Sequence, residues 1–167
     1  AVKAAIEMEG PVYLRFGRLA APIFNDPETY QFEIGKGITL REGKDVTLVA
    51  TGLMVSEALD AAEQLAAEGI SARVVNIHTI KPLDVDLIAK AAAETGLLIT
   101  VEEHSIIGGL GAAVAEAVCD TCPVPVVRIG VNDEYGHSGP AVDLLKEFGL
   151  CAEHIVEVTK ASMAKKA

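Results

Sequence analysis

From Asp45 onward, short apolar runs alternate with longer stretches in which apolar residues recur every three or four positions. The runs at 46–50, 72–77, 97–101 and 124–129 predict strands, and the spacing between them predicts helices. The run 97–101 is apolar apart from Thr100, so we expect helices to cover that strand on both faces. Alternation of this kind predicts an α/β fold with a mostly parallel, mixed sheet, a three-layer α/β/α sandwich.

Glycine and proline bound the predicted helices. Gly69 ends the first helix, and Pro82 is expected at the start of the second. Because proline cannot donate to a sheet ladder, Pro123 and Pro125 favour a sheet edge or a strand start for the run beside them. The first helix carries its apolar face on Val55, Ala58, Leu59, Ala62, Leu65 and Ala66, and the others are expected at 83–94, around 110–118, at 140–148 and at 153–165.

The N-terminal 44 residues do not share this alternation. Residues 1–9 predict the last turns of a helix and residues 11–16 a strand, with no earlier strand to pair with. Because a lone helix and strand cannot bury a core, we expect residues 1–18 to be the end of a preceding domain. The stretch 19–44, with its prolines and glycines, predicts a linker, and residues 45–167 a complete domain. Short strands are expected inside the linker, at 31–34 and 37–40.

Composition narrows the functional classes. Fourteen basic against twenty-four acidic side chains give a net charge of -10, which argues against nucleic acid as a partner. No apolar run approaches the ~18 residues of a membrane span, so no membrane partner is expected. Three cysteines form no even disulfide framework, which favours a reducing cytosol. Cys119 and Cys122 have C-x-x-C spacing, but they follow a helix and have no second pair, so a structural role is favoured over redox or zinc chemistry.

Charged residues follow the strand at 97–101, at the edge where parallel sheets bind ligands. Glu102 and His104 have the chemistry of an acid–base pair, although acids at a strand end are as often solvated or paired structurally. The glycines within 108–111 open a helix whose free amides could bind an anion. Their pattern lacks the last glycine of the dinucleotide-binding motif, so a tight strand–helix turn is favoured. Dinucleotide binding and contact with a partner chain's ligand are the alternatives.

Two arginines, Arg15 and Arg18, flank a flexible glycine at the end of the run 11–16. Guanidinium groups in this setting suit a phosphate or carboxylate ligand. The alternative is that one arginine is a surface residue and the other pairs with an acid across the domain junction. His137 and Ser138 have no acid beside them in sequence, so a hydrolase triad is not expected.

Several of these residues also carry a family resemblance. Nearly the whole chain resembles the C-terminal part of transketolases, through EGPVYLRFGR at 9–18, VEEHSIIGGLGAAV at 101–114, GVNDEYGHSGP at 130–140 and LLKEFGLCAEHI at 144–155. The resemblance identifies residues 1–18 with the end of the pyrimidine-binding domain and residues from about 45 with the transketolase C-terminal domain. Deoxyxylulose-phosphate synthase and the beta subunits of 2-oxo acid dehydrogenases share this fold, but the loop 132–140 favours transketolase.

The resemblance implies transfer of two-carbon ketol units between sugar phosphates, with thiamine diphosphate and Mg²⁺ as cofactors. In the family the cofactor lies between a diphosphate-binding domain and the partner's pyrimidine-binding domain. This sequence has neither the metal and diphosphate motif nor the glutamate that activates the thiamine ring. We therefore expect no cofactor, metal or catalytic residue on this chain alone, and no activity without the rest of the enzyme.

The chain is instead expected to be structural and to support a cytoplasmic homodimer, together with the remaining transketolase domains or an N-terminal subunit. Residue by residue, only Arg18 carries over, because it matches the family arginine that contacts the sugar phosphate. Glu102 and His104 match a family motif but no catalytic position. A free-standing module that binds a nucleotide or a partner at Gly108–Gly111 remains the alternative from another functional class.

Overall fold

The computed structural model describes residues 1–18 and 20–166, and its centre is a five-stranded sheet in the order β1-β3-β2-β4-β5. β2, β3, β4 and β5 are parallel, and β1 pairs antiparallel with β3. The mixed, mostly parallel sheet is therefore confirmed, with β5 at one edge. The strands are β1 (Ile38–Arg41), β2 (Val46–Ala50), β3 (Ala72–Asn76), β4 (Leu98–Ser105) and β5 (Val126–Val131).

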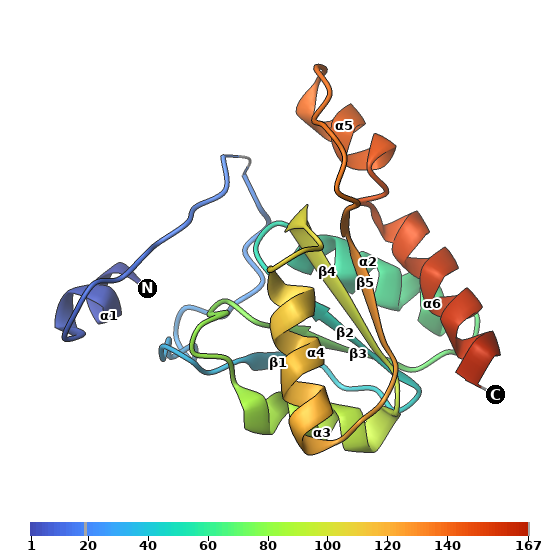
Figure 1. Cartoon of the computed structure of the whole chain (residues 1–167), viewed down its shortest axis with the longest axis horizontal. Helices are drawn as coiled ribbons and strands as arrows, with labels where there is room; N and C mark the ends of the chain where they lie inside the picture. Colours follow the sequence, from blue (N-terminus) through green and yellow to red (C-terminus); the bar gives the residue numbers. More distant parts are fainter. Residues whose placement is uncertain (19, 167) are drawn as a thin grey trace.

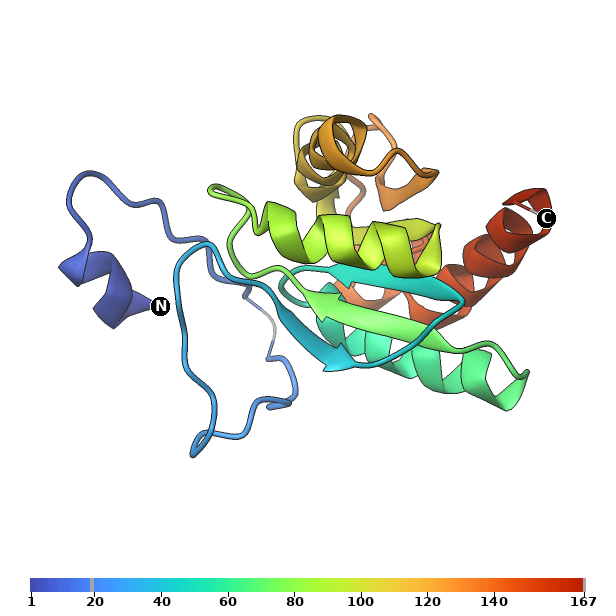
Figure 2. The ribbon, with the colours of Figure 1, turned by 90° about the horizontal axis from the view of Figure 1, so that it is seen from below.

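Helices cover both faces of this sheet and complete the three layers (Figure 1). Figure 2 shows α3 and α4 on one side of the strands and α2 and α6 on the other. The described helices are α1 (Val2–Glu7), α2 (Met54–Ala67), α3 (Val85–Thr95), α4 (Leu110–Thr121), α5 (Ala141–Glu147) and α6 (Ala152–Lys166).

Strand alternation divides the core into two clusters. Along β4, Ile99 and Val101 face α2 and α6, whereas Leu98 faces α3 and α4. β2 and β3 are buried at every position, as the apolar runs predict for strands covered on both faces. The clusters consist mainly of alanine, valine, leucine and isoleucine, which lets the helices lie close to the sheet.

Helix ends follow local chemistry. Gly69 lies just beyond the end of α2 with φ at 82°, a left-handed conformation that suits glycine, and its amide donates to the Ala66 carbonyl. The second predicted helix starts later than expected, at Val85 rather than Leu83. The reason is Asp84, whose carboxylate accepts from the Leu87 amide at 3.2 Å and caps the helix. The other carboxylate oxygen accepts from the Gly37 amide at 3.0 Å and ties α3 to the segment before β1.

Two predicted strands are wrong. Residues 11–16 form no strand, because no described strand offers them ladder hydrogen bonds, and residues 31–34 run into a turn. The strand expected at 37–40 is confirmed as β1, which joins the sheet from within the stretch 19–44. The helix expected at 1–9 is confirmed as α1, and Figure 1 shows it set apart from the sheet. The division into residues 1–18, 19–44 and 45–167 stays a prediction.

Candidate functional site

The charged residues after the buried part of β4 point to opposite faces of the sheet. Glu102 lies against the start of α4 and is 1% exposed, whereas Glu103 is half-buried beside Leu145 and Phe148, which pack on the α2 side of the sheet. The two Glu102 oxygens accept from the Leu110 and Gly111 amides at 2.7 and 2.8 Å. Glu102 is therefore the anion at the N-terminus of α4, a structural role rather than an acid–base one.

Gly109 makes room for that carboxylate, and Gly111 makes room for Arg128 and Thr100. A Cβ on Gly109 would lie 2.0 Å from Glu102 Oε2, and a Cβ on Gly111 would lie 2.8 Å from Thr100 Oγ1. These contacts support the interpretation as a tight strand–helix turn. Because Glu102 already occupies the Leu110 and Gly111 amides, the turn does not offer them to a diphosphate. His104 is exposed, and its Nδ1 lies 3.0 Å from the Ser105 carbonyl oxygen, so it does not pair with Glu102.

Arg18 lines a cavity of about 460 Å³ beyond the carboxyl ends of the parallel strands. Arg18 and Gly17 contribute from the N-terminal segment, Leu53 from the residue before α2, Glu103 from β4, and Gly139–Ala141 from the start of α5. The volume falls in the range of roughly 300–1,000 Å³ that is usual for small-molecule pockets. Arg18 thus lies at the sheet edge where ligands bind in open α/β folds.

Arg15 has a different environment from Arg18. Its guanidinium donates to the Glu103 carbonyl oxygen at 3.5 Å, which brings the N-terminal segment against the end of β4. It also lines an adjoining cavity of about 300 Å³ with Thr51, Gly52 and His104. Neither arginine forms an ion pair with a described acid, so the pairing expected as the alternative does not occur within the described residues.

His137 has an acidic partner that the sequence did not reveal. Its Nδ1 lies 2.6 Å from Glu147 Oε1, ten residues further along, and its ring lies 5.3 Å from that of Phe148. The pair holds the loop before α5 against the end of that helix. Ser138 makes no hydrogen bond with His137 in the described part of the chain, so this is not a hydrolase triad. The sequence contains one signal for this pair: His137 precedes a short helix, and Glu147 lies in the last turn of that helix.

His78 follows β3 and stacks on Phe32, with ring centroids 4.4 Å apart. Burial lowers the pKa of His78 below its ordinary value, which favours the neutral imidazole. This ring therefore joins the segment before β1 to the end of β3. His154, in α6, lies 3.7 Å from Glu157.

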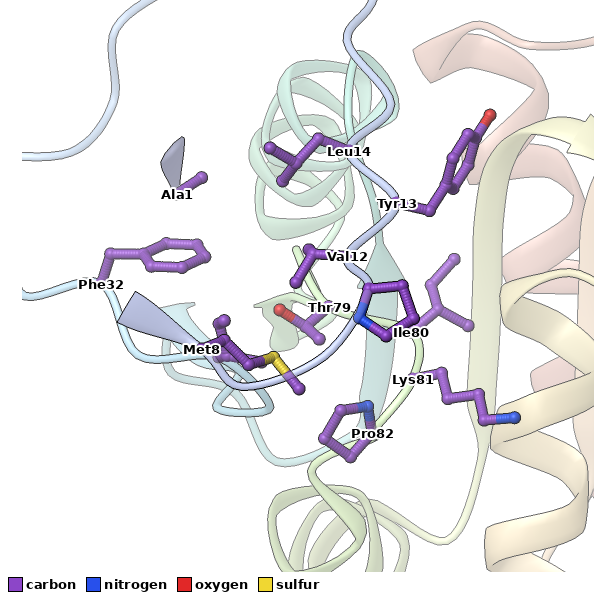
Figure 3. Close-up of a pocket in the computed structure, with 12 residues that line it drawn as sticks. Ala1, Met8, Val12, Tyr13, Leu14, Phe32, Thr79, Ile80, Lys81 and Pro82 are labelled. Carbon is purple, nitrogen blue, oxygen red and sulfur yellow. The ribbon is translucent and has the colours of Figure 1, made fainter. Parts of the chain in front are cut away.

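An apolar cavity of about 570 Å³ separates the N-terminal segment from the loop after β3. Figure 3 shows Met8, Val12 and Leu14 of that segment and Ile80 and Pro82 of the loop around it. Its lining is mostly apolar, with Tyr13, Thr79 and Lys81 as the polar side chains. This cavity is consequently a packing gap between the segment and the domain, not a candidate for chemistry.

No group of three or more His, Cys, Asp or Glu within residues 1–18 and 20–166 could hold a metal ion. With the α4 amides taken by Glu102, the described residues do not fit thiamine diphosphate and Mg²⁺ by themselves. The cysteines Cys119, Cys122 and Cys151 are free, and burial raises the pKa of the Cys151 thiol. No described helix has the length and apolar character needed to cross a membrane.

Similarity to known proteins identifies the family of this chain. Residues 35–155 match the family described as transketolase, C-terminal domain. The chain belongs to this family. It is 49% identical over 148 residues to the 6-deoxy-6-sulfo-D-fructose transketolase subunit SqwH of Clostridium sp. strain MSTE9, covering 89% of the chain and 46% of that protein. The resemblance inferred from residues 101–114 and 130–140 is thereby confirmed.

Two further relatives show how much of a longer protein this chain corresponds to. A split-gene transketolase solved as an inactive β4 tetramer superposes with a TM-score of 0.93 at 49% identity, covering 98% of the chain and 53% of that structure. The 1-deoxy-D-xylulose-5-phosphate synthase of Heliobacterium modesticaldum is 43% identical over 95% of the chain, which spans 25% of that enzyme. The chain thus spans about half the length of the transketolase subunits it matches, and the predicted fold class is confirmed.

Proposed function

We propose that this chain is the C-terminal section of a cytoplasmic transketolase that transfers two-carbon ketol units between sugar phosphates. Thiamine diphosphate and Mg²⁺ would supply the ketol-carrying chemistry and would bind to the remaining domains or to an N-terminal subunit. Residues 1–18 would complete a pyrimidine-binding domain, and residues 45–167 would support a homodimer. The contribution of this chain to the reaction is a phosphate contact, made by Arg18.

The observation that carries this proposal is the cavity that Arg18 shares with Leu53, Glu103 and the start of α5. A guanidinium group can present two parallel N–H donors to a phosphate, and no described acid occupies Arg18. A sugar phosphate held there has its phosphate on this chain, while its carbonyl end extends toward the rest of the enzyme. The role of the chain is therefore to bind and orient the substrate, not to form or break its bonds.

Arg18→Ala in the complete enzyme tests this role. Loss of a charge-assisted contact of about 1.5–3 kcal/mol lowers kcat/KM for a phosphorylated donor roughly tenfold to over a hundredfold. An unphosphorylated donor should be nearly unaffected. Lys3→Ala, at an exposed cation on α1, is the matched control. Equal losses for both donors would mean that Arg18 is only structural.

The synthase named among the relatives gives the second candidate function, because it is 43% identical over nearly the whole chain. The beta subunits of 2-oxo acid dehydrogenases belong to the same group of alternatives. Product analysis separates them. Two-carbon transfer between sugars supports transketolase, whereas formation of 1-deoxy-D-xylulose 5-phosphate supports the synthase.

A further inference from the structure

The Arg18 cavity contains a second charged group, the carboxylate of Glu103. Its neighbour Glu102 is fully used by the α4 amides, but the Glu103 carboxylate has no hydrogen bond or ion pair with any described residue. Arg15 contacts only the main-chain carbonyl of Glu103. The Glu103 carboxylate is half-buried and its oxygens stay accessible, so they can accept hydrogen bonds from a ligand in the cavity.

The placement of Glu103 follows from the sheet. The pairing of β4 with β5 shifts register between Val101 and Ser105, and within this stretch Glu103 lines a cavity with Leu145 and Phe148, which pack against the core cluster on the α2 side. There it lines the 460 Å³ cavity of Arg18, the adjoining 300 Å³ cavity of Arg15, and a third of about 340 Å³ beside His137 and Phe148. Among the described acids, Glu103 is the one that lines all three of these cavities.

A guanidinium and a carboxylate in one small cavity restrict the ligand. Arg18 attracts an anionic group, whereas Glu103 repels a second anion and accepts hydrogen bonds from neutral hydroxyls. The ligand that satisfies both has one phosphate at one end and hydroxyl groups beside it. A bisphosphate or a dicarboxylate would bring a like charge against Glu103.

We infer that Glu103 is a specificity-determining residue, which accepts a hydrogen bond from a hydroxyl of the sugar phosphate whose phosphate Arg18 holds. The inference rests on the proposed function, since it takes Arg18 as the phosphate contact. Glu103 then discriminates in two ways. It favours hydroxylated monophosphates through a charge-assisted hydrogen bond, and it disfavours a bare phosphate through repulsion.

These two effects have opposite signs when Glu103 becomes neutral, and Glu103→Gln therefore tests the inference. Inorganic phosphate should bind the full chain about twofold to tenfold more tightly, because a nearby like charge is removed. In the complete enzyme, KM for the sugar phosphate should rise several-fold with kcat little changed, because the weaker hydrogen bond to the hydroxyl outweighs the relieved repulsion of its phosphate. Phosphate binding is followed through the Gly17 amide by NMR titration.

Three variants make the outcome decisive. Glu63→Gln, at an exposed acid of α2, changes the net charge equally and should leave both measurements unchanged. Glu103→Asp keeps the charge on a shorter side chain, so phosphate affinity should stay at the wild-type value while KM rises. Circular dichroism confirms that each variant is folded.

The Arg18→Ala variant distinguishes failure of the Glu103 inference from failure of the proposed phosphate site. Loss of phosphate binding in Arg18→Ala, with Glu103→Gln indistinguishable from the wild type in both measurements, would overturn the role of Glu103 alone. Unchanged phosphate binding in Arg18→Ala would overturn the phosphate site, and the inference with it. Weaker phosphate binding in Glu103→Gln would also contradict the inference, because it would mean that the carboxylate helps to hold the anion.

Discussion

Glu102→Gln should destabilise the domain, although glutamine has nearly the shape of glutamate. The carboxylate is 1% exposed and satisfies two amides at the start of α4, those of Leu110 and Gly111. Glutamine can accept from one amide through its oxygen, but it presents an N–H₂ donor to the other. One buried N–H of α4 then faces a second donor instead of an acceptor.

The magnitude follows from these contacts. A hydrogen bond to a charged acceptor contributes about 1.5–3 kcal/mol, and a buried donor left without a partner costs about 1–3 kcal/mol. Removal of a buried charge offsets part of this loss. We expect the free energy of unfolding to fall by about 2–4 kcal/mol, which places the site among the sensitive positions of the fold.

Urea unfolding followed by circular dichroism measures the change. With a urea slope of about 2 kcal/mol/M, the midpoint should fall by roughly 1–2 M. Glu116→Gln, at an exposed acid on the same helix, is the control and should shift the midpoint little. A Glu102→Gln midpoint within the control's range would refute the capping role and reopen an acid–base one.

The contacts that hold the segment before β1 against the sheet give two further predictions. Asp84→Ala should lower the free energy of unfolding by about 1–2 kcal/mol, because Asp84 caps α3 and also accepts from the Gly37 amide. Urea unfolding measures this change, with the exposed Asp86→Ala as the control. Equal destabilisation by the two substitutions would contradict the role of Asp84. Because burial lowers the pKa of His78, the unfolded chain binds more protons than the folded chain once the pH falls to about 6.5. The stability contributed by the neutral ring is therefore lost as the pH falls through that value toward the lower pKa of the folded state. The stability difference between wild type and His78→Gln should narrow over that range, and parallel pH profiles would count against it.

Periodicity predicted the sheet because the apolar runs of its central strands are buried on both faces, as β2 and β3 show. It failed for residues 11–16, since an extended apolar segment forms a strand only where a neighbouring strand supplies hydrogen bonds. The Arg18 cavity could not be assembled from sequence, because Leu53, Glu103 and Pro140 converge only through the sheet order.

Among the polar contacts, the local turn was predictable from sequence and the long-range hydrogen bonds were not. The turn after β4 was predictable from its glycines, but the acceptor of its amides was not, because Glu102 precedes them by eight and nine residues. The pair of His137 with Glu147 spans α5 and depends on how the preceding loop folds back. Local spacing thus predicted elements and turns, whereas contacts across the fold required the structure.

Calorimetric titration with thiamine diphosphate and Mg²⁺ tests most directly whether this chain is one section of a larger transketolase. The chain alone should show no binding at micromolar concentrations and no ketol transfer. After it is combined with the diphosphate- and pyrimidine-binding sections of the same enzyme, cofactor binding and transfer between sugar phosphates should appear together. Micromolar cofactor binding or ketol transfer by the chain alone would contradict the account.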